Sequence, residues 1–143
     1  MSLSEREVAD RIEIRDVLAR YMKAIRVKDL DLMDACFTED ARIDYTAIGG
    51  SEKSWPDTKE WLHPMVVGVE LFWLYVGEVY PELRGDEAAV ETTWHGVFVS
   101  EAGAAPLVIF GSYDDTFVRT ADGWRIKYRK DRPEIQVLSA GRG

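Results

Sequence analysis

The sequence predicts an α+β fold, with helices in its first half and long strands in its second half. Residues 5–26 place apolar side chains at helical spacing. From residue 71 onward the chain is instead rich in β-branched and aromatic residues, in segments at 71–80, 88–100, 107–119 and 124–137. Helices followed by strands are typical of a sheet that carries its helices on one face.

Three helices are expected before the long strands. Ser4 and the glutamate three residues later have the spacing of a capping box, so the first helix should begin after Ser4. Asp29 is suited to cap a short second helix, and Pro56 indicates the start of a third. Pro64 lies inside the third helix and should kink or shorten it.

The strand segments predict one antiparallel meander preceded by a short strand. Residues 41–45 alternate apolar and charged side chains, which is typical of a strand. The four later segments are joined by short turns such as Arg84-Gly85-Asp86. A chain of 143 residues has the length of one domain, so residues 1–143 are predicted to form a single domain.

Composition excludes several classes of partner. The net charge of −8 disfavours nucleic acid and an anionic membrane surface, because both need a basic footprint. Cys36 is the only cysteine, and the two histidines have no carboxylate at ligand spacing, so we predict no metal and no cofactor. The polar N-terminus has no apolar signal segment, which makes a cytoplasmic location the expectation.

Two motif-like runs carry a resemblance to a known family. The first joins Arg20-Tyr21, Lys28-Asp29-Leu30-Asp31 and Phe37-Thr38-Glu39-Asp40-Ala41, and the second joins Gly111-Ser112-Tyr113-Asp114-Asp115 to Asp122-Gly123-Trp124-Arg125-Ile126. With the order of elements, they resemble the SnoaL-like branch of the nuclear-transport-factor-2-like superfamily. The resemblance implies a cone, in which a curved, mixed, mainly antiparallel sheet packs on three N-terminal helices around an apolar cavity.

The resemblance also implies a range of functions. Members include steroid isomerases, dehydratases and polyketide cyclases, so the fold alone does not settle the activity. We expect a cofactor-independent lyase, isomerase or cyclase acting on a small apolar, aromatic or polycyclic compound. The alternatives are a non-catalytic module for ligand binding or dimeric assembly, and a structural partner subunit. The family's outer sheet face often forms a dimer, which predicts a homodimer here.

Three residues are candidates for catalysis. Tyr21 matches a helix-borne tyrosine that donates a hydrogen bond to an oxyanion in steroid isomerases, although a core tyrosine bonded to a backbone carbonyl fits equally. Asp114 matches a second donor of those enzymes, a neutral carboxylic acid, but an ion pair with a nearby arginine or lysine is the alternative. The third candidate is His95, because histidine is the side chain most often used for proton transfer near neutral pH. The alternative is a structural or exposed histidine, and alternation does not show which face of its strand points inward.

His95 is considered because the bases of the relatives are absent from their usual positions. Arg26, Tyr45 and Leu74 occupy these positions, and none of them is a good proton acceptor. Arg26 either binds an anion at the cavity mouth or pairs with Asp29 or Glu39 at the end of the helix. The predicted substrate-binding residues are Arg26, Tyr45, Trp55, Trp61, Met65, Phe72 and Leu74.

Overall fold

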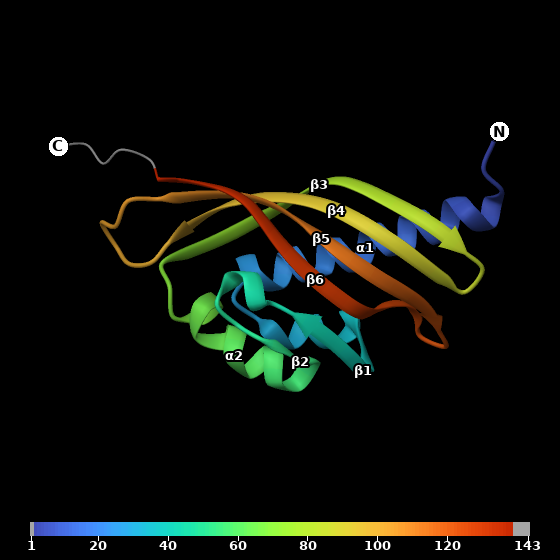
Figure 1. Ribbon diagram of the computed structural model, residues 1–143, viewed down its shortest axis with the longest axis horizontal. Coiled ribbons are helices and arrows are strands. Elements are labelled where there is room, and N and C mark those ends of the chain that lie inside the picture. Colours follow the sequence, from blue (N-terminus) through green and yellow to red (C-terminus); the bar gives the residue numbers. More distant parts are fainter. Residues whose placement is uncertain (1, 139–143) are drawn as a thin grey trace.

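The computed structural model describes residues 2–138 as a curved sheet packed against helices (Figure 1). The ends of the predicted domain, residue 1 and residues 139–143, lie outside the described part of the chain. The elements are α1 (Glu5–Arg26), the 3₁₀ helix η1 (Leu30–Cys36), β1 (Phe37–Asp44), the 3₁₀ helix η2 (Thr46–Ile48), β2 (Glu52–Ser54), α2 (Trp55–Val67), β3 (Leu71–Arg84), β4 (Glu87–Val99), β5 (Leu107–Thr120) and β6 (Gly123–Leu138).

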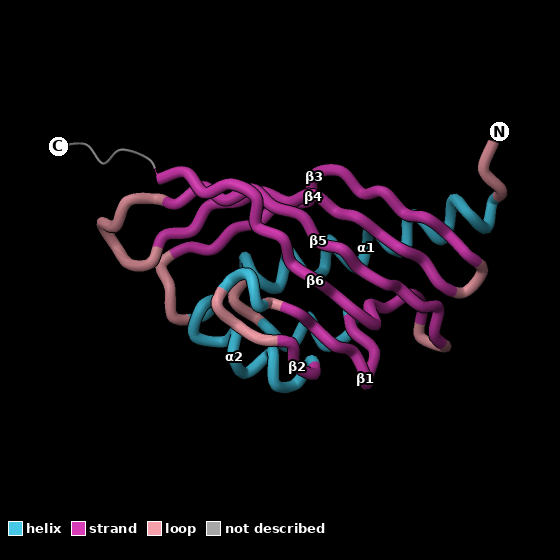
Figure 2. The backbone as a smooth tube through the Cα atoms, in the orientation of Figure 1, coloured by secondary structure: helices cyan, strands magenta, loops and turns pink. Residues whose placement is uncertain are grey.

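The six strands form one sheet in the order β2-β1-β6-β5-β4-β3. The predicted meander is confirmed, because β3, β4, β5 and β6 pair antiparallel with their chain neighbours. β1 joins the other side of β6 in parallel, which makes the sheet mixed. Figure 2 shows the long strands bending together over the helices. The three-residue strand β2 and the helix η2 are not evident from the sequence pattern.

The first helix begins where the sequence predicts, while the second differs from the prediction in type and the third in length. The Ser4 hydroxyl accepts from the backbone N–H of Glu7 at 3.1 Å, and the Glu7 carboxylate accepts from the backbone of Ser4, which forms the expected capping box. The second helix is a 3₁₀ helix. The third continues past Pro64 to Val67.

A buried polar cluster joins the first helix to the far end of the sheet. Arg119 on β5 donates to both carboxylate oxygens of Asp10 on α1, at 2.7 and 2.9 Å. The indole N–H of Trp124 donates to the same carboxylate at 3.0 Å. The bidentate geometry fixes the orientation of α1 on the sheet. Across residues 2–138, no helix has the length and apolar character needed to cross a bilayer.

Candidate active site

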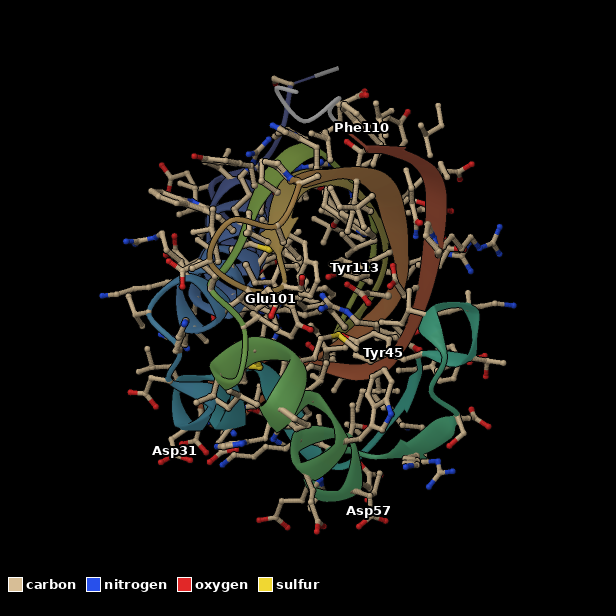
Figure 3. All side chains as sticks on the ribbon, turned by 90° about the vertical axis from the view of Figure 1, so that its left-hand side faces the viewer. Asp31, Tyr45, Asp57, Glu101, Phe110 and Tyr113 are labelled. Carbon is tan, nitrogen blue, oxygen red and sulfur yellow. The ribbon has the colours of Figure 1, made fainter. Side chains whose placement is uncertain are left out.

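A cavity of about 390 Å³ lies between α1, α2 and the inner face of the sheet. This volume falls within the usual range of small-molecule pockets, about 300–1,000 Å³. Figure 3 looks into the enclosure formed by the sheet, with Tyr113 inside it and Phe110 at its outer edge. The lining is mostly apolar and consists of Tyr21, Ile25, Tyr45, Ala47, Ile48, Leu62, Met65, Val66, Phe72, Leu74, Trp94, Phe98, Leu107, Ile109, Tyr113, Asp131, Pro133 and Gln136.

A pair of tyrosines provides the first polar feature of the cavity. The hydroxyl groups of Tyr21 on α1 and Tyr45 after β1 are 2.6 Å apart. Burial raises the pKa of both phenols, and that of Tyr45 rises well above its usual value, so both remain protonated at neutral pH. Because one hydroxyl donates to the other, one O–H stays available for a ligand oxygen.

The second polar feature is the carboxyl group of Asp131 on β6. The residue is only 4 % exposed, and burial raises its pKa to about 7. The positive charge of Arg129 and the indole of Trp94 oppose this effect. A carboxyl group with this pKa exchanges a proton readily near neutrality, which is what a general acid or base requires.

A buried ion pair lies behind the tyrosines. Arg129 on β6 is fully buried and donates to both oxygens of Asp115 on β5, at 2.8 and 2.9 Å. Its guanidinium also lies over the rings of Tyr113 and Tyr21, 3.7 and 4.5 Å from their centroids. The ion pair therefore places a fixed cation behind the aromatic wall of the cavity.

Five of the predicted site residues line the cavity. They are Tyr21, Tyr45, Met65, Phe72 and Leu74. Tyr21 bonds to another side chain, so the alternative of a bond to a backbone carbonyl is not what the structure shows. These residues come from α1, the end of β1, α2 and β3, and the curvature of the sheet brings them together.

Two of the catalytic candidates lie outside the cavity. Asp114 points to the outer face of β5, where its carboxylate pairs with Arg132 at 2.7 Å. His95 is exposed and lies between the rings of Tyr75 and Phe110, with centroid distances of 5.3 and 6.0 Å. Asp114 and His95 therefore do not reach the cavity, so the proton-transfer and oxyanion roles predicted for them there do not fit this structure. The face of His95, which alternation left open, is the outer one.

Asp114 and His95 lie outside the cavity because of the direction in which side chains alternate along their strands. Trp94 on β4 is buried, so its neighbour His95 points to the other face of the sheet. On β5, the side chains of Tyr113 and Asp115 are buried, which leaves Asp114 outward. The ion pair with a nearby arginine, the alternative for Asp114, is confirmed by the contact with Arg132.

Three predicted binding residues also lie outside the lining. The guanidinium of Arg26 lies over the ring of Trp73, 5.5 Å from its centroid. Trp55 stacks on Phe37 at a centroid distance of 4.4 Å and donates to Asp34 at 2.9 Å. Trp61 packs behind Tyr45, at a centroid distance of 6.2 Å. Trp55 and Trp61 support the walls without lining the cavity. Within residues 2–138, Arg26 forms an ion pair with neither of its expected partners, Asp29 and Glu39, and Asp29 instead accepts from the backbone of Asp31.

Sequence reasoning missed Asp131 because a β-bulge reverses the alternation on β6. Trp124 and Ile126 are buried, and counting onward by twos predicts that Lys130 faces inward. The pairing of β5 with β6 shifts between Thr116 and Phe117, and after this shift the buried positions are Arg129 and Asp131. Tyr113 and Trp94 were missed because simple alternation does not reveal which face of the sheet is inward.

A family model described as a SnoaL-like domain matches residues 6–130. The chain belongs to this family. The match covers both sequence runs that carried the resemblance, the tyrosine pair and the buried ion pair. Asp131 follows directly after the matched residues.

Curated relatives of the SnoaL-like chain have no named activity. An uncharacterised protein of Mycobacterium tuberculosis, Rv2910c, is 38% identical over 138 residues, which cover 95% of this chain and 93% of that protein. An uncharacterised protein of Mycobacterium bovis, Mb2934c, matches with the same figures. The names of these relatives do not identify a reaction.

Solved structures share the fold at low identity. A Novosphingobium aromaticivorans protein named as a candidate scytalone dehydratase has a TM-score of 0.86 and 16% identity, covering 98% of this chain and 94% of that chain. A hexachlorocyclohexane dehydrochlorinase, LinA-type3 from Novosphingobium barchaimii, has a TM-score of 0.81 and 17% identity, covering 94% and 92%. At this identity the likeness establishes the fold and leaves the activity open.

Proposed function

We propose that this SnoaL-like protein is a cofactor-independent lyase or isomerase that moves a proton on a small, neutral, aromatic or polycyclic compound. The observation that carries the proposal is the position of Asp131, a buried carboxyl group with a pKa of about 7 in the wall of an apolar cavity. The same wall holds a tyrosine pair with a hydroxyl proton to donate. The names of the dehydratase and dehydrochlorinase neighbours agree with this class of reaction.

In the proposed mechanism the tyrosine pair binds the oxygen on which negative charge develops. Tyr21 and Tyr45 are held by packing and by each other, so little reorganisation is needed when the charge forms. Arg129 lies over the ring of Tyr21, and its positive charge favours electron density on the phenol oxygen. Donors fixed in this way in an apolar cavity stabilise a developing oxyanion strongly.

Asp131 acts as the base in the same mechanism. Its ionised carboxylate accepts a proton from the substrate, and the protonated carboxyl group returns the proton at the new position or to the leaving group. Because its pKa is about 7, both forms are populated near neutral pH. Asp131 therefore takes the role that the sequence analysis gave to His95.

The cavity lining limits the proposed substrate to neutral molecules. None of the described residues that line it is a lysine, arginine or histidine. The cation behind the tyrosines, Arg129, is already paired with Asp115. An anionic ligand would lose its hydration beside a carboxyl group without gaining a free cation, which is costly in an apolar site.

The proposed base can be tested with nitrobenzisoxazole, a small bicyclic probe that opens when a base removes its ring-carbon proton. The N–O bond breaks, a nitrile forms, and the electron pair remains on a coloured phenolate that the tyrosines can stabilise. Loss of a general base costs about 10²–10⁴-fold in rate, so we expect this loss in Asp131→Asn. Asp114→Asn, which alters a similar carboxylate on the outer face, is the matched control.

The absorbance of the phenolate gives the rate, and the result separates catalysis from binding. We expect the rate of the unmodified protein to rise with pH through about 7, as the pKa of Asp131 requires. A rate that is the same in Asp131→Asn and in the unmodified protein would sink the proposal. Binding of a neutral probe such as naphthol without any conversion would favour the alternative of a binding module.

We also propose that the outer sheet face pairs with a second copy of the chain. This face exposes Trp73, Tyr75, Phe110 and Ile135, and Tyr75 and Phe110 stack on either side of His95. Contiguous apolar surface of this kind is typical of interaction sites. The pairing would leave the cavity accessible, because the cavity is on the opposite face of the sheet.

A further inference from the structure

Trp94 and Asp131 approach each other across an intervening strand. Trp94 lies on β4 and Asp131 lies on β6, with β5 between them. Trp94 is opposite Gly111 on β5, and the next inward residue of β5, Tyr113, is opposite Asp131. The indole therefore contacts the carboxyl group only if its ring extends over β5.

Gly111 makes this arrangement possible. A Cβ atom built on Gly111 would lie 2.8 Å from Cε2 of Trp94 and 2.8 Å from the carbonyl oxygen of Arg132, closer than real Cβ contacts allow. Position 111 requires glycine for reasons of space, because a residue without a side chain lets another side chain cross close to the backbone. The indole of Trp94 occupies the volume that a side chain at position 111 would fill.

Two buried polar atoms lie near each other at the end of the ring, since the Trp94 indole acts on Asp131 as a donor that lowers its pKa. Both Nε1 of Trp94 and Oδ1 of Asp131 are inaccessible to solvent, and neither has a hydrogen-bond partner of ideal geometry among the described residues. The indole N–H is a donor only, and a carboxylate oxygen is an acceptor. Buried polar atoms rarely remain unpaired, so the two atoms complement each other.

We propose that Trp94 is a positioning residue for Asp131, and that Gly111 is the residue that allows it. The indole N–H holds Oδ1 of Asp131, which leaves the other carboxyl oxygen directed toward the cavity and the substrate. The inference rests on the proposed function only for the role of Asp131 as the base. A carboxyl group held through one oxygen presents the other in a fixed direction, as proton transfer requires.

The direct test is the indole N–H signal of Trp94 in a proton–nitrogen correlation spectrum, assigned by its loss in Trp94→Phe. We expect this signal to move with pH as Asp131 ionises, with a midpoint near 7. The movement should disappear in Asp131→Asn and persist in Asp114→Asn, whose substitution is on the outer face. A signal that does not move, or that moves equally in Asp131→Asn, overturns the proposal.

This spectrum needs no substrate, so it can fail or succeed independently of the proposed reaction. The other groups facing Asp131 are Arg129, Asp115 and the three tyrosines at positions 21, 45 and 113. The phenols stay protonated because burial raises the pKa of each. Loss of the signal movement in Asp131→Asn therefore assigns the titration to Asp131.

A second test uses the pH dependence of nitrobenzisoxazole opening. Trp94→Phe removes a donor that favours the charged carboxylate, so the midpoint of the rate should move up by about one pH unit. Gly111→Ala should give the same direction of change by displacing the indole, and Trp73→Phe, an exposed tryptophan, should leave the midpoint in place. A uniform loss of rate with an unchanged midpoint would show a purely structural role and overturn the proposal.

Discussion

Asp131→Asn should stabilise the protein at alkaline pH while it removes the proposed base. The folded protein holds the pKa of this carboxyl group at about 7, against 3.8 for an unperturbed aspartate. Between these values the folded state binds more protons than the unfolded chain, so the free energy of unfolding falls as the pH rises through about 7. Asparagine has nearly the same shape and no charge, so this loss should be absent from the variant.

The size of the effect follows from the two pKa values. At about 1.4 kcal/mol for each pKa unit, the full difference corresponds to about 4 kcal/mol, of which about 2.5 kcal/mol is lost between about pH 5 and about pH 8. This is a large fraction of the total stability of a small domain, about 5–15 kcal/mol. The ionised carboxylate of Asp131 in the apolar cavity therefore lowers the free energy of unfolding at neutral pH.

Urea denaturation at both pH values measures this directly. The fall in the free energy of unfolding between about pH 5 and about pH 8 should be smaller in Asp131→Asn than in the unmodified protein by about 2.5 kcal/mol. Asp114→Asn is the control, because its side chain is partly exposed and paired on the outer face. The reasoning is refuted if Asp131→Asn keeps the full pH dependence, or if Asp114→Asn removes it to the same extent.

Three further predictions concern stability and assembly. Asp115→Ala should lower the free energy of unfolding by about 3–5 kcal/mol in urea denaturation, because it leaves the buried cation of Arg129 unpaired; a cost below about 1 kcal/mol would contradict this. Ser4→Ala removes the helix cap and should cost about 0.5–2 kcal/mol in the same assay, whereas no cost would mean that the cap is not formed in solution. Phe110→Asp should shift sedimentation toward the monomer if the outer face pairs copies of the chain, while Ile12→Asp, an exposed residue on α1, should not. An unmodified protein that sediments as a monomer would refute the pairing.

The sequence by itself determined the fold, because the signals for it are local. Capping, helical spacing and the segments of β-branched and aromatic residues each depend on neighbours a few positions away. They predicted α1, the order of elements and the four-stranded meander, which the structure confirms. The resemblance added Tyr21, in the last third of α1, and Tyr45, directly after β1, and the structure brings their hydroxyl groups together.

Only the tertiary structure decided which carboxyl group faces the cavity. Asp114 and Asp115 are adjacent, so they lie on opposite faces of β5, and each face carries one carboxyl group. On β6 the bulge that follows Ile126 exchanges the two faces, so the alternation that correctly buries Trp124 wrongly directs Asp131 outward. The register between two paired strands decides which residues point to the inner face of the sheet. Strand pairing is a contact between distant residues that no local pattern specifies.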